Sequence, residues 1–349
     1  MLAHRNIPRH STMTKVLLTG GSGFIAAHIL ELLVQRGYEI VTTVRSEDKA
    51  SQIREAHPHA KLSVVIVPDI AQPDAFDEVV KTPGLDVVLH TASPFHFNWS
   101  DAKTELLEPA ITGTTSILKA IKKSAPGVKR VVVTSSFVSM LSVEGLQDPN
   151  KVYSESDWNP NTYEDGLTGN KVAAYRVSKT VAEQSAWKFV AEEKPNFDLV
   201  TICPPLVFGP TVHHLSSLSA INTSNERFVD LVQGKWKNEI LPSIGVNLWV
   251  DVRDVALAHV AAFEKPDAGG KRFFCTAGKF CNREIAAAAR KNFPELKDKL
   301  PSEEVMGGDY PAVVPGYDNS RATGVLGIDW IDLEKSTVDN IKSLLAIGA

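Results

Sequence analysis

The sequence predicts an α/β fold in which a doubly wound parallel sheet is followed by a smaller C-terminal lobe. Short apolar runs of strand length alternate with helical patterns from residue 15 to about residue 193, which is typical of a parallel sheet with helices on both faces. A glycine-rich turn, Gly20-Gly21-Ser22-Gly23, joins the first apolar run to the first helical pattern. At 349 residues and 43% hydrophobic content, the chain is long enough to bury the core of such a sheet and of a second lobe.

The first strand is predicted at Lys15–Thr19, and apolar residues recur at helical spacing after the turn. Strand, glycine turn and helix in this order are typical of a Rossmann dinucleotide-binding unit. Gly20 permits the tight turn, Gly23 lets the backbone approach a pyrophosphate, and the helix N-terminus supplies N–H donors. The alternative is an ordinary turn between a strand and a helix. The predicted cofactor-binding residues of this segment are Gly20, Gly21, Ser22, Gly23, Phe24 and Ile25.

The second strand, predicted at Tyr38–Val44, ends at Arg45, with Ser46 and Lys49 following. A site for NAD would place Asp or Glu near this position to hold the ribose 2′-hydroxyl. A guanidinium instead matches a 2′-phosphate in geometry and charge. We therefore predict NADPH/NADP as the cofactor, the alternative being that Arg45 only points into solvent.

Further strands are predicted at Leu62–Val67, Val87–His90 and Arg130–Thr134, separated by helices at Glu47–His57, Asp74–Lys81 and Pro109–Ser124. Ligands of doubly wound sheets bind at the carboxyl ends of the strands. The side chains predicted at this edge are Asp69 and Ile70 beside the adenine, Thr91, Ala92 and Ser93 beneath the phosphates, and Ser135 and Ser136.

Tyr175 and Lys179 lie four residues apart in a helix predicted to continue to Glu193, so their side chains share one face. A lysine ammonium beside a phenol favours the phenolate and would lower the tyrosine pKa toward neutrality. Ser136 would donate a hydrogen bond to a substrate carbonyl oxygen, Tyr175 would deliver the proton, and Lys179 would hold the nicotinamide ribose. Taken singly, the pair also fits a solvated helix face, and Ser136 a turn residue.

Together these segments resemble the extended short-chain dehydrogenase/reductase superfamily over nearly all of residues 14 to 345. More narrowly, the chain resembles the fungal NADPH-dependent methylglyoxal (isovaleraldehyde) reductases, which are relatives of the dihydroflavonol reductases. The segments that carry the resemblance are Gly20–Ala27, Val67–Ile70, Leu89–Phe95, Thr134–Ser136, Tyr175–Lys179, Pro205–Pro210 and Val250–Val255.

This resemblance implies an enzyme that transfers hydride from NADPH to an aldehyde or ketone and so makes an alcohol. It implies Ser136, Tyr175 and Lys179 as the catalytic residues. It also implies Arg45 and Lys49 on the 2′-phosphate, Asp69 and Ile70 near adenine, and Val207 and Ser224 near the nicotinamide half of the cofactor.

Apolar side chains near the predicted site favour a hydrophobic substrate pocket. Phe95, Phe97 and Phe137 are its predicted walls, and Leu206 stands where some relatives have an aromatic residue. Such a pocket prefers carbonyl compounds with apolar groups over phosphorylated or carboxylated ones. The alternative for each ring is an ordinary place in the core.

Two other functions share part of this pattern. Sugar-nucleotide epimerases and dehydratases have the same fold and Tyr–Lys pair, but an acidic residue would be expected near position 45. A regulator that binds NADP without turnover would lack the catalytic tyrosine, whereas Tyr175 is present. A hydroxysteroid or cinnamoyl-CoA-like reductase would differ only in its substrate and stays open.

Composition limits the partners. A net charge of −4 gives no reason to expect nucleic acid or an anionic membrane, and no apolar stretch reaches the ~18 residues of a membrane span. The three cysteines lack metal-ligand spacing and indicate reduced thiols in the cytoplasm. We expect a flexible leader at 1–13, an NADP-binding domain at 14–205, a mostly substrate-binding lobe at 206–349 with segments returning to the sheet, no bound metal, and a monomer or homodimer.

Overall fold

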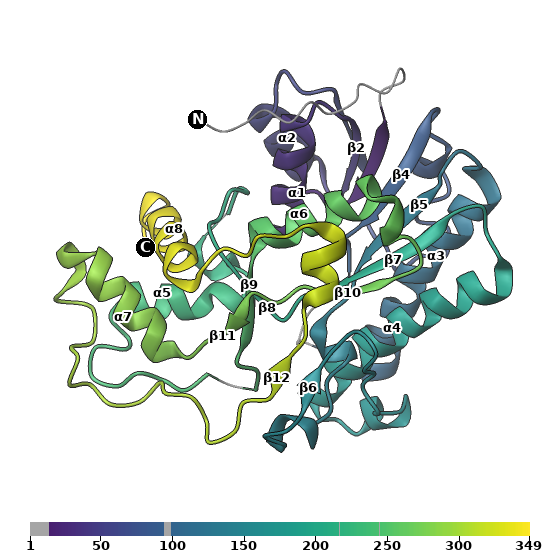
Figure 1. Ribbon diagram of the computed structural model, residues 1–349. Helices are drawn as coiled ribbons and strands as arrows, with labels where there is room; N and C mark the ends of the chain where they lie inside the picture. The colour runs from purple at the N-terminus through teal and green to yellow at the C-terminus, as the bar shows by residue number, and fades with distance from the viewer. Residues whose placement is uncertain (1–13, 94–98, 216, 244) are drawn as a thin grey trace.

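A computed structural model describes residues 14–93, 99–215, 217–243 and 245–349. Within this part, a parallel sheet of seven strands has the order β10-β7-β5-β4-β1-β2-β3, and helices cover both of its faces (Figure 1). The predicted doubly wound sheet is therefore confirmed. The strands are β1 (Lys15–Thr19), β2 (Glu39–Val44), β3 (Leu62–Ile66), β4 (Leu85–His90), β5 (Arg130–Thr134), β7 (Asp198–Cys203) and β10 (Arg272–Phe274).

Alternate residues of the central strands pack on opposite faces of the sheet, because side chains alternate along a strand. In β1, Val16 and Leu18 join one core with residues of the helices α1 and α6. Leu17 joins the other core, which contains Ile117 of α3 and Phe189 of α4. Both faces are buried, which explains the near-continuous apolar runs. These helices and α2 span Phe24–Gln35 (α1), Glu47–Ala56 (α2), Glu108–Ser124 (α3), Lys171–Glu193 (α4) and Val252–Glu264 (α6).

The helix that carries Tyr175 and Lys179 has a well-defined start. Asn170 is the N-cap of α4, and its side-chain oxygen accepts hydrogen bonds from the backbone N–H groups of Val172 (3.0 Å) and Ala173 (3.1 Å). The helix ends at Lys194, whose φ of 43° lies in the left-handed region. Helix α6 begins at a similar cap, with the Asp251 carboxylate accepting from Arg253 N.

The smaller lobe lies beside the carboxyl edge of the sheet (Figure 1). Its core contains the aromatic residues Phe208, Phe228, Trp236 and Phe280. A two-stranded ribbon of β6 and β12 joins a segment of the first half of the chain to the C-terminal part. The remaining elements are β6 (Val152–Tyr153), β8 (Leu206–Phe208), α5 (Glu226–Val232), β9 (Leu248–Asp251), β11 (Gly278–Lys279), α7 (Asn282–Asn292), β12 (Gly316–Tyr317) and α8 (Leu333–Ala346).

One predicted helix is wrong. Residues 73–78 form turns, and only Val79–Lys81 forms a single 3₁₀ turn where a helix was predicted at Asp74–Lys81. The N–H groups of Ala75 and Asp77 bond to carbonyl groups three residues earlier. Pro73 and Pro83 bound this segment. Thr82 has a ψ of 121°, because proline disfavours the helical conformation in the residue before it.

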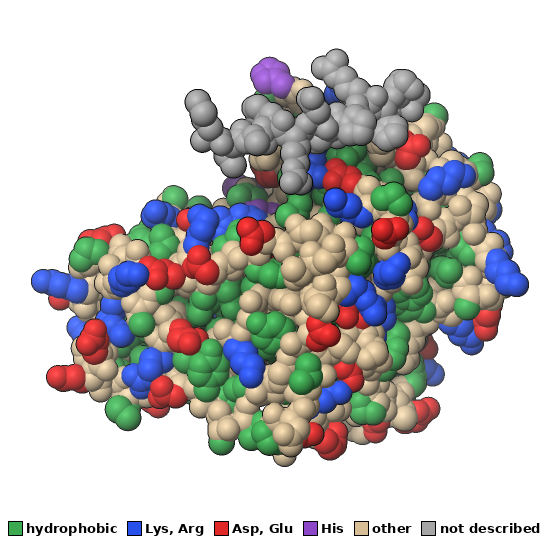
Figure 2. Space-filling view, in the orientation of Figure 1, with side chains coloured by type: hydrophobic (Ala, Val, Ile, Leu, Met, Phe, Trp, Pro, Cys, Tyr) green, Lys and Arg blue, Asp and Glu red, His purple; other side chains and the backbone are tan. Residues whose placement is uncertain are grey.

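The surface mixes charges of both signs. On the face in Figure 2, Lys and Arg side chains are interspersed with Asp and Glu, in keeping with a net charge of −4. In the part of the chain that the structure describes, no helix combines the length and the apolar character needed to cross a bilayer. The predicted leader at 1–13 lies outside the described residues.

Candidate active site

The glycine turn between β1 and α1 packs tightly against its neighbours. Gly20 has φ +72°, and a Cβ added there would lie 3.1 Å from the Ala92 Cα at the end of β4. A Cβ on Gly21 would lie 2.1 Å from the Thr42 Oγ1 of β2. The turn therefore needs glycine at position 20 for its backbone conformation and at position 21 for space.

The start of α1 is suited to an anion. Gly23 is its exposed N-cap; no side chain among the described residues caps it, and its first turn contains no acidic residue. Free N–H groups and the positive end of the helix dipole therefore meet at the glycine turn. Ser22 and Ile25 are half-buried there, and Phe24 is buried. This arrangement fits the pyrophosphate of a dinucleotide.

The ends of β1 and β4 are tied together by the Thr19 side chain. Its Oγ1 lies 2.9 Å from His90 Nδ1 and accepts a hydrogen bond from Ala92 N at 3.1 Å. Thr91 Oγ1 donates to the Thr19 carbonyl oxygen. His90 is thus a packed core residue. The segment 91–93 is held directly beside the glycine turn.

The structure brings Ser136, Tyr175 and Lys179 to this same edge. Ser136 follows β5 and starts a 3₁₀ turn at Phe137–Ser139, with its Oγ accepting from Val138 N at 3.3 Å. The Tyr175 side chain hydrogen-bonds to that of Ser136. The ammonium of Lys179 donates to Ser93 Oγ at 2.7 Å. Helix α4 therefore links the end of β5 to the end of β4.

The electrostatics differ from the sequence-based expectation in one respect. Burial raises the pKa of Tyr175 above its ordinary value of 10, and the hydrogen bond with Ser136 offsets this only in part. The predicted lowering of the Tyr175 pKa toward neutrality is therefore wrong, because the net shift is upward. Burial instead lowers the pKa of Lys179 to about 8, and burial together with the nearby Lys179 charge lowers that of His90 to about 4.

Two cations follow β2. Arg45 is exposed directly after the strand, and Lys49 is half-buried in the first turn of α2, whose N-cap is Ser46. Lys49 lines a cavity of about 440 Å³ together with Gly21 and Ser22 of the glycine turn. The Lys49 side chain and the glycine turn therefore border one space, which fits a phosphate on the adenosine half of a dinucleotide.

The other predicted cofactor contacts lie further along the edge. Asp69 is exposed, and its carboxylate accepts from Ala71 N and from the Gln72 amide, which lowers its pKa. Ile70 is half-buried against the α3 side of the core. Val207 N donates to Ser224 Oγ at 3.3 Å. Val207 and Ser224 are therefore in contact, as expected for two residues that border the same part of the cofactor.

The predicted substrate pocket needs a correction. Phe137 is 1% exposed and stacks on Phe274 with ring centroids 4.9 Å apart, so its ring belongs to the core between the sheet and the smaller lobe. Leu206 is half-buried at the start of β8. Phe95 and Phe97 lie outside the described residues.

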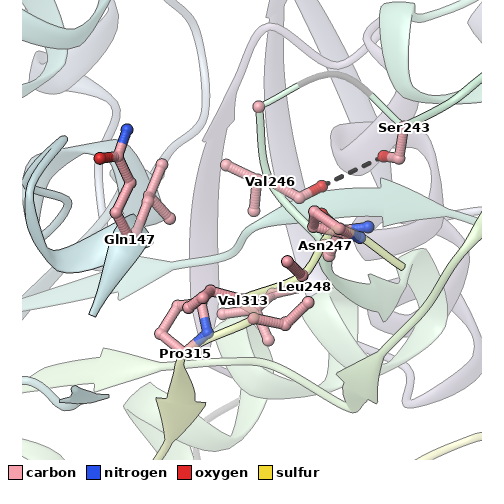
Figure 3. Close-up of a pocket in the computed structure, with 12 residues that line it drawn as sticks. Gln147, Ser243, Val246, Asn247, Leu248, Val313 and Pro315 are labelled. Atoms are coloured by element: carbon pink, nitrogen blue, oxygen red, sulfur yellow. Dashed lines mark hydrogen bonds between the residues drawn. The ribbon is translucent and has the colours of Figure 1, made fainter. Parts of the chain in front are cut away.

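A cavity of about 430 Å³ borders this core, because Leu248 of the core and the neighbouring Val246 line it (Figure 3). It is lined mainly by apolar side chains, with Gln147, Ser243 and Asn247 as its labelled polar ones. Among the described residues, its lining includes neither the three predicted catalytic residues nor Phe137 and Leu206.

Two buried charged residues behind Ser136 had no signal in the sequence analysis. Glu183 lies one turn after Lys179 in α4 and pairs with Arg272 of β10. The spacing of Glu183 from Lys179 can be read from the sequence. Its partner Arg272, 89 residues away, cannot, because only the fold brings β10 to α4.

Comparisons with known proteins show what the whole chain is similar to. The model of the NAD dependent epimerase/dehydratase family matches residues 16–275. The ketoreductase azaE of Aspergillus niger is 46% identical over 96% of this chain and 98% of its own length. A putative NADPH-dependent methylglyoxal reductase, GRP2 of Candida albicans, is 40% identical over 96% of this chain and 99% of its own. The crystal structure of Gre2 from Candida albicans in complex with NADPH superposes with a TM-score of 0.90 at 35% identity, covering 96% of this chain and 100% of that one.

Proposed function

The chain belongs to the NAD dependent epimerase/dehydratase family, and from this premise we propose that it is an NADPH-dependent reductase of aldehydes or ketones. The observation that carries the proposal is the convergence of Ser136, Tyr175 and Lys179 at the carboxyl edge of the sheet, beside the glycine turn. Relatives named as a ketoreductase and as NADPH-dependent methylglyoxal reductases support it.

The chain's own residues fit the proposed cofactor. The uncapped start of α1 would hold the pyrophosphate, and Arg45 and Lys49 would hold the 2′-phosphate. Lys179 and Ser93 would bind the ribose next to the nicotinamide. When bound, NADPH supplies the hydride for the carbonyl carbon.

The pKa directions give each catalytic group a role. Tyr175 keeps its proton at neutral pH because its pKa lies above 10, so it is a donor that releases the proton only to a strong base such as a developing alkoxide. Ser136 Oγ, held beside the tyrosine, would donate to the substrate oxygen and fix its position. Lys179, with a pKa of about 8, is mostly cationic at pH 7 and would stabilise negative charge as the proton leaves Tyr175.

The epimerase alternative predicts a different outcome. An epimerase would regenerate its cofactor in each cycle, whereas a reductase consumes added NADPH with a simple ketone or aldehyde. The cations after β2 and the names of the relatives favour the reductase.

The test combines a substrate panel with one variant. We expect loss of NADPH absorbance with apolar aldehydes and ketones, and Tyr175→Phe to lower kcat by about 10²- to 10⁴-fold, the usual contribution of a general acid. The NADPH Kd, measured by fluorescence, should change less than about threefold, because a phenol hydroxyl makes few of the cofactor contacts.

Tyr38→Phe is the matched control. It removes a hydroxyl that donates to Glu264, the last residue of α6, at 2.6 Å. Tyr38 directly precedes β2, at the end of that strand away from the carboxyl edge. Its kcat should equal that of the wild type. Turnover by Tyr175→Phe at the wild-type rate would refute the proton-donor role. A wild-type protein that consumes no NADPH with any aldehyde or ketone of the panel would refute the reductase function.

A further inference from the structure

The buried carboxylate of Glu183 contacts the turn that carries Ser136, through the residues on either side of that serine. Glu183 is 2% exposed and accepts hydrogen bonds from Ser135 Oγ at 2.6 Å and from Thr201 Oγ1 at 2.8 Å. Ser139 Oγ lies 2.5 Å from the same carboxylate. Residues of β7 and of the turn after β5 therefore share one acceptor on α4.

The two serines bracket Ser136. Ser139 N donates to the Ser136 carbonyl oxygen at 3.0 Å, and Ser139 Oγ lies 2.7 Å from that oxygen. On the other side, Ser135 N donates to Ile202 O at 2.8 Å. The Ser135 hydroxyl donates to Glu183. The Ser139 hydroxyl lies within hydrogen-bond distance of both the Glu183 carboxylate and the Ser136 carbonyl oxygen, and so bridges them. The Ser136 side chain hydrogen-bonds to Tyr175.

Arg272 neutralises the carboxylate and extends the network. Its Nε donates to Glu183 Oε1 at 2.7 Å, and its Nη2 donates to Ser139 Oγ at 3.2 Å. Its Nη1 donates to the carbonyl oxygens of Glu155 (2.8 Å) and Asp157 (2.7 Å). The guanidinium thus ties the loop that leads toward α4 to the same point.

This pattern is specific for a carboxylate. The two oxygens of the Glu183 carboxylate only accept, so each O–H or N–H group that is hydrogen-bonded to them must be the donor. The amide of a glutamine would place an NH₂ donor where one carboxylate oxygen lies, and this donor would face the neighbouring donors. Because Glu183 and Arg272 are both buried, the cost of removing their charges from water offsets the attraction between them, and the ion pair adds little to stability. Its main effect is therefore on the geometry of the turn that carries Ser136.

We propose that Glu183 and Arg272 are positioning residues for Ser136, setting the orientation of its hydroxyl toward Tyr175 and the substrate oxygen. This inference rests on the proposed reductase function. Neither residue touches the reacting atoms, so their effect passes through Ser136.

A double-mutant cycle tests the proposal. Glu183→Gln keeps the shape and removes the charge and one acceptor. We expect kcat to fall about 10- to 100-fold, as for an approximately 1 Å displacement of a catalytic group, with the NADPH Kd within about twofold of the wild type. When Ser136 is already replaced by Ala, Glu183→Gln should lower kcat by less than about threefold, because its effect passes through a hydroxyl that is gone.

Asp198→Asn is the matched control. Asp198 forms a bidentate ion pair with Arg130 across the same strands β5 and β7, at their opposite ends. This variant should lower the midpoint of thermal unfolding and leave kcat unchanged once rates are normalised to NADPH-binding sites. If Glu183→Gln does not fold, Ser139→Ala removes only the hydroxyl between Glu183 and Ser136 O, and it should lower kcat about fivefold or more by the same route.

The outcomes separate the two proposals. The positioning role is overturned if Glu183→Gln lowers kcat by the same factor in the wild type and in the Ser136→Ala variant. It is also overturned if kcat is unchanged in the folded Glu183→Gln or Ser139→Ala variant. Neither result affects the proposed reductase function. Absence of carbonyl reduction by the wild type, or a Ser136→Ala variant with wild-type kcat, instead overturns the proposed function.

Discussion

Replacing Gly21 by alanine tests whether space, rather than backbone conformation, requires glycine at this position of the turn. The added Cβ would lie 2.1 Å from Thr42 Oγ1 and 3.2 Å from Thr42 Cβ and Cγ2. Thr42 is fully buried, and its Oγ1 donates to Leu18 O at 2.8 Å. The threonine therefore has no solvent-exposed position into which it can move.

The expected cost is that of overpacking a core, about 1–3 kcal/mol. For a chain of this size each kcal/mol lowers the unfolding midpoint by roughly 2–4 °C. Thr42→Ala removes the two atoms nearest the new methyl group and by itself loses about 1 kcal/mol with its hydrogen bond. In Gly21→Ala/Thr42→Ala the two costs should not add, with a favourable coupling of about 1 kcal/mol or more.

The assay is thermal unfolding followed by circular dichroism, with urea unfolding as the equilibrium measure. Gly324→Ala is the control, because a Cβ there meets no described atom within 4 Å, and its midpoint should equal or exceed that of the wild type. A Gly21→Ala protein as stable as the wild type, or costs that simply add in the double variant, would refute the steric reasoning.

Two more predictions concern charge. Arg45→Asp replaces the exposed cation after β2 by an anion that suits a ribose hydroxyl, so the NADPH/NADH ratio of kcat/KM should fall about 10- to 100-fold or more; an unchanged ratio contradicts the phosphate assignment. Burial raises the pKa of Asp254 to about 7; because this folded-state pKa exceeds the unfolded one, the stability due to its protonated form is complete below about pH 4 and is lost as the pH rises through 7. Asp254→Asn retains an acceptor for Ile331 N and should raise the unfolding midpoint at pH 8, corresponding to at least about 1 kcal/mol, but not at pH 4; the same difference at both pH values would exclude this cause.

Local patterns predicted well where short-range forces decide the structure. The strand, turn and helix around Gly20, and the helix through Tyr175, follow from apolar periodicity, glycine and capping within a few residues. The helix predicted at Asp74–Lys81 failed because periodicity alone does not show that the segment between two prolines stays in 3₁₀ turns. The roles of the predicted site residues stay predictions.

The ring of Phe137 illustrates the limit of reasoning from position in the chain. It directly follows Ser136, the predicted catalytic serine, yet it stacks on Phe274, 137 residues later. No pattern near residue 137 carries that information. The same holds for the pKa of Tyr175, whose direction depends on how much of the phenol the folded chain covers.

The sequence by itself determined the order of strands and helices, the glycine turn and the spacing of Tyr175 and Lys179, because these depend on neighbours within one or two helical turns. Only the tertiary structure decided that Ser93 meets Lys179, that Glu183 meets Arg272, and that burial raises the tyrosine pKa. The physical reason is that hydrogen-bond partners and desolvation are set by segments far apart in the chain, which meet only when the sheet assembles.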